Sequence, residues 1–79
     1  MSPTVLRWRG FRFFFFSREE RRPHIHVSGA SGEAKFWLVP TPELAQNYRL
    51  PALQIAELLA VVKERRDEFL EAWRKHFAG

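Results

Sequence analysis

The sequence predicts an α+β fold: an antiparallel sheet of three to four N-terminal strands packed on one long C-terminal helix. Most of the 8 Phe and 3 Trp residues precede Pro40, in stretches rich in residues that favour strands. After Pro51 the apolar residues recur at helical spacing instead. The chain has 79 residues, which is the size of one small domain. We therefore expect a single domain over 1–79, with the sheet at about 4–45 and the helix at about 52–77.

Turn residues and charges divide the N-terminal half into short extended segments. Gly10 separates the first two segments into a hairpin, and five consecutive charged residues at 18–22 form a loop before Pro23. Gly29 and Gly32 mark the next turn, and Pro40 ends the last strand. The predicted strands are 4–8, 11–17, 24–28 and 33–39. A fifth extended piece near 43–45 has only a weak signal.

The C-terminal third has the pattern of one amphipathic helix. Apolar residues fall at spacings of three and four among charged residues: Ile55, Leu58, Leu59, Val62, Phe69, Leu70, Trp73 and Phe77. A straight helix over 52–77 would be about 39 Å long, whereas the strands would reach only about 17–23 Å. The helix must therefore bend near 65–67 or overhang the sheet. Because no Gly, Pro or capping box marks a break, we favour one helix with an overhanging end.

Side-chain alternation along the strands separates two faces of the sheet. The core face would carry Leu6, Trp8, Phe13, Phe15, Ile25, Val27, Phe36 and Leu38. The opposite face, which we call the second face, would carry Val5, Arg7, Arg9, Arg12, Phe14, Phe16, His24, His26, Lys35 and Trp37. One helix covers only one face, so the second face is predicted to be a binding surface with Arg21 and Arg22 beside it.

The mixture of cations and rings on the second face has three interpretations. Rings that stack on bases and cations that meet phosphates are typical of proteins that bind single-stranded nucleic acid. The same residues also suit a protein interface with a polar rim, which we favour, and the third interpretation is plain surface. The formal net charge is +4, and all of the excess lies in residues 1–50. Any attraction for an anionic partner should therefore belong to the N-terminal half.

His24 and His26 are the candidate chemical residues. A His-x-His pair on a strand places two imidazoles together, and Glu19, Glu20 or His76 would have to complete a metal site. Alternatively, a histidine would act as the general base of a ribonuclease, since imidazole titrates near neutral pH and Arg21 or Arg22 would neutralise a phosphate. The plainest interpretation, which we favour, is that both rings pack beside Trp37 and hydrogen-bond across the sheet. We expect no cofactor and no dedicated metal site.

The absence of cysteine excludes disulfides, thiolate metal sites and cysteine catalysis, and it suits a reducing compartment. The N-terminal residues lack the apolar core of a signal peptide, and no apolar run approaches the roughly 20 residues that span a bilayer. We expect a cytoplasmic protein with no membrane association.

Several blocks of the chain together resemble a bacterial family of small proteins, the domain of unknown function 4160 family. The matching residues are Phe11 to Ser17 with Glu20, Pro23-His-Ile-His-Val27, Glu33-Ala-Lys-Phe-Trp-Leu38, Pro40, Leu44, Asn47, Leu70, Trp73 and Phe77. The resemblance implies a partner, since members often pair with a small protein of the domain of unknown function 2442 family in suspected toxin–antitoxin modules. It carries over no catalytic residue. The basic Arg21-Arg22 turn departs from the family pattern.

These observations lead to a functional expectation. The chain should be a non-enzymatic binding component of a toxin–antitoxin-like pair, with a small protein encoded alongside it, or a second copy of itself, as partner. The alternative is a small RNA-cleaving or nucleic-acid-binding protein that uses the basic, aromatic second face and the His24/His26 pair.

Overall fold

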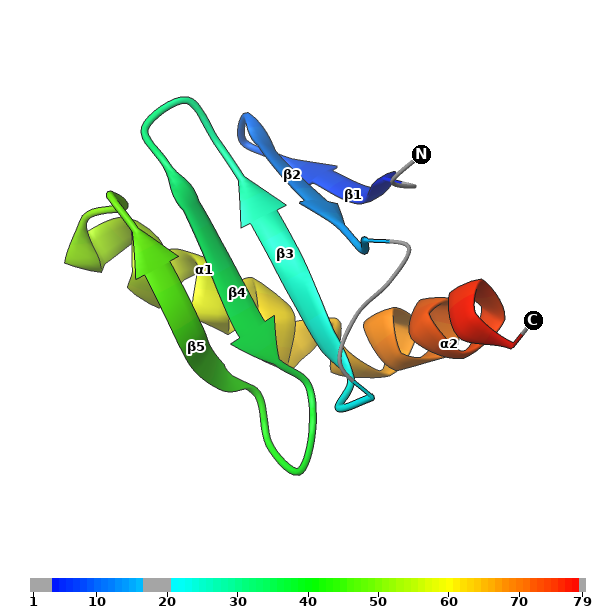
Figure 1. The fold of residues 1–79 in the computed structure, drawn as a ribbon. Helices are drawn as coiled ribbons and strands as arrows, with labels where there is room; N and C mark the ends of the chain where they lie inside the picture. The colour runs from blue at the N-terminus through cyan, green and yellow to red at the C-terminus, as the bar shows by residue number, and fades with distance from the viewer. Residues whose placement is uncertain (1–3, 17–20, 79) are drawn as a thin grey trace.

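The computed structural model describes residues 4–16 and 21–78, and it has an α+β fold in which two helices lie against a five-stranded antiparallel sheet (Figure 1). The strand order follows the sequence order, so each strand pairs with the next one along the chain. Within the described residues no helix is long and apolar enough to cross a membrane. The elements are β1 Thr4–Trp8, β2 Phe11–Phe14, β3 His24–Ser28, β4 Glu33–Trp37, β5 Glu43–Tyr48, α1 Ala52–Glu64 and α2 Arg66–Phe77.

The first hairpin turns at Arg9 and Gly10. Both residues have positive φ angles, 48° and 82° respectively, and Trp8 pairs directly with Phe11 across the turn. Two consecutive residues with positive φ match the right-handed twist of the strands that they connect, and glycine adopts this conformation without strain. The predicted hairpin is therefore confirmed, with a turn of only two residues.

The sheet has five strands, whereas three to four were predicted with only a weak signal for a fifth near 43–45. β5 extends to Tyr48 rather than ending near Ala45, and its pairs with β4 run from Trp37 opposite Glu43 to Glu33 opposite Tyr48. Its sequence, ELAQNY, lacks a clear alternation of apolar and polar residues. Hydrogen bonding to the neighbouring strand β4 therefore determines this strand more than the propensity of its own residues does.

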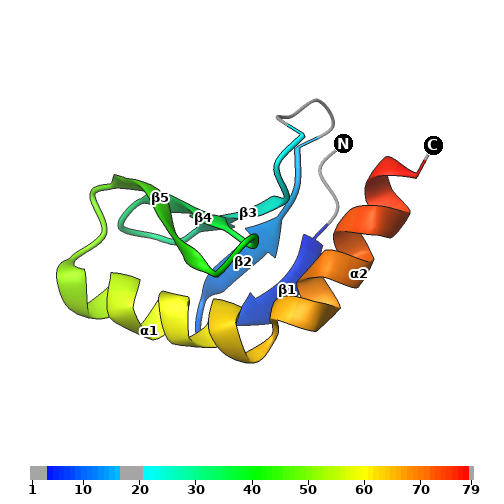
Figure 2. The ribbon, with the colours of Figure 1, turned by 90° about the horizontal axis from the view of Figure 1, so that it is seen from below.

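The predicted single helix is wrong, because the helix breaks at Arg65. Arg65 has φ −105° and ψ 18°, outside the helical range, and it joins α1 to α2. The Arg66 side chain donates from Nε to the Leu38 carbonyl oxygen at 2.8 Å and so anchors the start of α2 at the end of β4. The break lets α1 lie along β4 and β5 (Figure 2), while α2 turns to place Trp73 against Phe15, just beyond the end of β2. The helix therefore bends around a sheet that is shorter than the helix itself.

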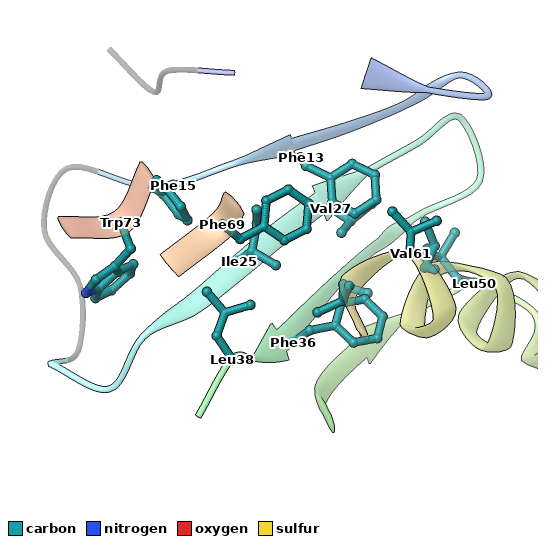
Figure 3. Close-up of a cluster of buried hydrophobic side chains, with 13 residues drawn as sticks. Phe13, Phe15, Ile25, Val27, Phe36, Leu38, Leu50, Val61, Phe69 and Trp73 are labelled. Atoms are coloured by element: carbon teal, nitrogen blue, oxygen red, sulfur yellow. The ribbon is translucent and has the colours of Figure 1, made fainter. Parts of the chain in front are cut away.

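The core lies between the sheet and the two helices (Figure 3). Its centre is a stacked pair of fully buried rings, Phe13 from β2 and Phe69 from α2, with centroids 5.6 Å apart. The predicted burial of Phe13, Phe15, Ile25, Leu58, Val62 and Phe69 is confirmed. Trp8 and Leu59, which the strand alternation and the helical spacing also predict to be buried, are only partly buried at the margin of the core.

Val5 was also assigned to the wrong face. It packs against the core cluster rather than lying on the second face. The register of β1 against β2 shifts between Thr4 and Leu6, and a shift of one residue reverses the face that a side chain occupies. Simple alternation from the sequence does not detect such a bulge.

Candidate binding face of the sheet

The second face of the sheet is largely uncovered by the helices. Among the described residues, both helices lie mainly on the other side of the sheet (Figure 2), and α2 reaches the second face at its margin, where Trp73 contacts His24. The strand register places a continuous row of side chains across four strands on this side, with Phe14 opposite His26, His26 opposite Lys35 and Lys35 opposite Gln46. The sheet therefore presents rings and cations in one connected surface.

Phe14 is held between a cation and an imidazole. The guanidinium carbon of Arg12 lies 4.4 Å from the Phe14 ring centroid, and the His26 ring stacks at 5.6 Å with an interplanar angle of 26°. Arg12 Nε also donates to Thr4 Oγ1 at 2.7 Å, which fixes the guanidinium over the ring. Phe14 is consequently only 6% exposed, although it lies on the uncovered side of the sheet.

The Trp37 ring has two cations over it, Lys35 and Arg22. Lys35 Nζ lies 4.5 Å from the ring centroid and the Arg22 guanidinium carbon lies 4.2 Å from it. Lys35 precedes Trp37 by two residues in β4, whereas Arg22 lies beyond the Trp37–His24 pair in the turn before β3. Arg22 Nε donates to the Val39 carbonyl oxygen at 2.8 Å, so the turn is attached to the sheet. The indole is therefore part of a preformed cation–aromatic stack.

Phe16 is the exposed ring of this group. It is 44% exposed, and it contacts Phe14 and His26 edge-on at centroid distances of 5.2 and 4.5 Å. An exposed ring that is supported by buried rings has few conformations to lose when a partner binds. Phe16 is therefore the best-placed anchor on the second face.

The two histidines lie side by side, as predicted, with ring centroids 5.1 Å apart. They differ in environment: His24 is fully buried against Trp37 and the α2 residue Trp73, whereas His26 is half-buried. His24 Nδ1 lies 2.7 Å from the Arg22 carbonyl oxygen, which requires Nδ1 to carry a proton and donate it to the oxygen. This contact fixes the orientation of the ring.

The described residues gather no third metal ligand around the histidine pair. No group of three His, Asp or Glu side chains that would hold a metal occurs among the residues that the structure describes. His76, one of the suggested third ligands, lies instead against the Phe15 ring, with its Nε2 3.4 Å from the Phe16 carbonyl oxygen. Glu19 and Glu20, the other suggestions, lie outside the described residues.

The remaining predicted cations are distributed unevenly. Arg7 lies directly opposite Arg12 in the register of β1 and β2, and Arg21 is exposed in the turn before β3. Arg9 does not belong to the second face: it lies over the Trp8 ring at 4.9 Å and pairs with Glu57 of α1 at 3.9 Å. Its positive φ in the hairpin turn removes it from the alternation of the strand, so its assignment to the binding face was wrong.

Sequence reasoning missed the part of the face that β5 supplies. Gln46 and Tyr48 extend the second face beyond Lys35 and Glu33, and a depression of about 470 Å³ lies there. Its lining residues are His26, Glu33, Ala34, Lys35, Gln46, Asn47 and Tyr48. The only available signal was the weak fifth strand, since Gln46 and Tyr48 join the face only when β5 pairs with β4.

Comparison with known proteins agrees with the resemblance seen in the sequence. The model of the family described as Domain of unknown function (DUF4160) matches residues 10–74, a range that includes β2 to β5, α1 and most of α2. No curated protein and no solved structure gives a significant match to the chain. The family match covers both the core face and the cation–aromatic second face, and the chain therefore belongs to the DUF4160 family.

Proposed function

We propose that this protein is a non-enzymatic binding component of a toxin–antitoxin-like pair, and that it binds a small partner protein in the cytoplasm through the second face of its sheet. The observation that carries the proposal is the connected row of rings and cations on the side of the sheet that the helices leave largely uncovered. A surface of this kind on a small protein is typical of an interaction site.

The state of the rings favours a protein partner over nucleic acid. Stacking on bases requires accessible ring faces. Phe14 is nearly buried between Arg12 and His26, and Trp37 already has Arg22 and Lys35 over its ring. Rings that are rigidly held with cations around them suit a protein interface, where aromatic and arginine side chains supply most of the binding energy.

The burial of His24 supports a non-enzymatic role. A general base must lie within hydrogen-bond reach of a substrate proton. His24 has no exposed surface, and its Nδ1 is engaged by the Arg22 carbonyl group. The imidazole that borders the surface, His26, is packed by Phe14 and Phe16. The pair is therefore better suited to building the face than to carrying out chemistry.

The direct test uses Phe16 with a matched control on the opposite side of the molecule. The chain is co-expressed with the product of the neighbouring gene, and the mass and affinity of the complex are measured for the wild type, Phe16→Glu and Leu53→Glu. Leu53 is 73% exposed on α1, so both variants add the same charge at an exposed apolar site. We expect Phe16→Glu to weaken binding by about tenfold or more, as for an interface anchor, and Leu53→Glu to bind like the wild type. Equal binding by both variants would exclude the second face as the partner site.

Nucleic-acid binding is the second candidate function, because Arg7 and Arg12 lie directly opposite each other. Cations on a sheet face that also carries aromatic rings are typical of proteins that bind single-stranded nucleic acid. If single-stranded RNA binds here, log affinity should fall linearly with log salt, with a slope of about −0.7 per phosphate neutralised.

Two variants separate charge from stacking in that experiment. Arg12→Ala should reduce the magnitude of the slope by about one unit, whereas Trp37→Ala should cost about 1–3 kcal/mol with little change in slope. Absence of saturable RNA binding at moderate ionic strength would exclude nucleic-acid binding and retain the protein interface as the candidate function.

Growth assays address the enzymatic alternative. Each protein of the pair is expressed alone, and growth inhibition is compared for the wild type and His26→Gln, which removes the imidazole at the border of the face. We expect inhibition, in whichever partner it occurs, to be independent of this imidazole. RNA cleavage by purified protein that is lost in His26→Gln would instead favour a ribonuclease.

A further inference from the structure

The outer edge of β5 has the features of a strand that pairs with another strand. β5 ends the strand order, and at six residues it is the longest strand of the sheet. It contains no Lys, Arg or Pro, which commonly block an edge strand; its one charged residue is Glu43 at the first position, and its register against β4 shifts at Ala45. The opposite edge of the sheet differs, since β1 carries Arg7, and its residues Thr4 and Val5 line a hollow together with Ala72, Lys75 and His76 of α2. Of the two edges, β5 is therefore the one that is open to an added strand.

Two exposed apolar side chains lie on this strand. Leu44 is 40% exposed and Tyr48 is 63% exposed, and they lie toward opposite ends of β5. Leu44 shares the core side with Phe36, whereas Tyr48 lies on the second face opposite Glu33. A strand that added here would therefore cover apolar surface on both sides of the sheet as well as satisfying backbone groups.

The charges at the two ends of β5 are complementary in an antiparallel self-pairing. Glu43 begins the strand, and Arg49 follows directly after its last residue. A two-fold axis near Ala45 and Gln46 would place Glu43 of each copy opposite Tyr48 and next to Arg49 of the other copy. Because the register of β5 against β4 shifts at Ala45, Glu43 and Tyr48 lie on the same side of the sheet, and Leu44 and Asn47 share the other side. These residues therefore meet side chains from their own side in this arrangement, which a register shifted by one residue would not achieve.

We propose that a second copy of this chain pairs along β5, antiparallel and about a two-fold axis, to form one continuous sheet across the dimer. The side-chain contacts occur twice, as in any two-fold interface. Because the added strands meet edge to edge, the second faces of the two copies lie on the same side and form one wider surface. This proposal does not depend on the identity of the partner that the second face binds.

The test is a concentration series of the purified chain by sedimentation velocity, from about 1 μM to 1 mM, because a contact between two short strands falls in the class of small, weak interfaces. We expect a reversible monomer–dimer equilibrium that Leu44→Lys weakens by about tenfold or more, since an edge lysine opposes strand pairing. Leu53→Lys is the matched control, an exposed leucine on α1 that should leave the equilibrium unchanged.

Charge reversal provides a second, specific readout. Glu43→Arg and Arg49→Glu should each weaken the dimer, and the double variant should recover most of the lost affinity, because the opposite charges meet again. The melting temperature of each variant is measured in parallel, since Glu43 also pairs with Arg22 within the chain at 3.4 Å. The self-pairing is supported if the double variant regains more dimer affinity than its melting temperature accounts for.

A chain that stays monomeric at 1 mM would overturn the proposal, as would a dimer that Leu44→Lys and the charge reversals leave intact. Hydrogen exchange distinguishes a further outcome. If the amides of β5 become protected only when the neighbouring gene product is added, the edge accepts a strand from that partner and the second copy is excluded. If the chain does not self-associate but Phe16→Glu still weakens partner binding, this inference is rejected and the proposed function is retained.

Discussion

Two adjacent leucines on α1 provide the sharpest test of how the helix packs. Leu58 is fully buried, whereas Leu59 is only partly buried at the margin of the core. Replacing either leucine by Ala removes the same three carbon atoms and changes helix propensity in the same way. At about 0.8 kcal/mol per buried carbon group, the transfer term at Leu58 is about 2.4 kcal/mol, and the cavity raises the expected loss to about 3–5 kcal/mol. At Leu59 we expect about 1–1.5 kcal/mol, because much of the side chain already contacts solvent and little cavity forms.

The assay is urea denaturation, followed by tryptophan fluorescence and far-ultraviolet circular dichroism. A domain of this size has a total stability of roughly 4–12 kcal/mol, so Leu58→Ala needs a stabilising osmolyte if it is unfolded in buffer. The wild type and Leu59→Ala are then measured under the same conditions. Equal losses in the two variants, or a larger loss in Leu59→Ala, would refute the orientation of α1 against the sheet.

The remaining predictions concern single contacts that position the elements. Arg66→Met should lower the free energy of unfolding by about 1–3 kcal/mol, because it leaves the Leu38 carbonyl group without its guanidinium donor. Arg65→Met removes only an exposed ion pair with Glu68 and should lower it by less than about 1 kcal/mol. A larger loss in Arg65→Met than in Arg66→Met would contradict the anchoring of α2 by Arg66. Gly32→Ala should lower the melting temperature more than Gly10→Ala does. A Cβ at Gly32 overlaps the backbone oxygen of Tyr48, whereas a Cβ at Gly10 meets no atom within 4 Å and costs only the strain of its positive φ. Equal melting temperatures of the two variants would be inconsistent with the close approach of Tyr48 to Gly32.

Some features of the molecule followed from sequence alone because their causes are local. The Arg9-Gly10 turn, the start of β3 after Pro23 and the start of the helical region after Pro51 depend on backbone preferences of a few residues. The pairing of His24 and His26 on one face follows from the two-residue period of a strand, whatever the rest of the chain does. The division into a core face and a second face was therefore predictable for β2, β3 and β4.

Other features depend on contacts between separate elements of the fold, and only the three-dimensional structure decided them. β5 exists because its backbone pairs with β4, and the helix breaks at Arg65 because Arg66 bonds to the end of β4 while Phe69 and Trp73 must reach Phe13 and Phe15. The candidate site shows the same division. Residue types and alternation placed Phe14, His26, Lys35 and Trp37 on one surface, but the three-dimensional packing buried His24 and left Phe16 as the exposed ring. Backbone propensity acts over a few residues, whereas the exposure of a side chain depends on what the rest of the fold places against it.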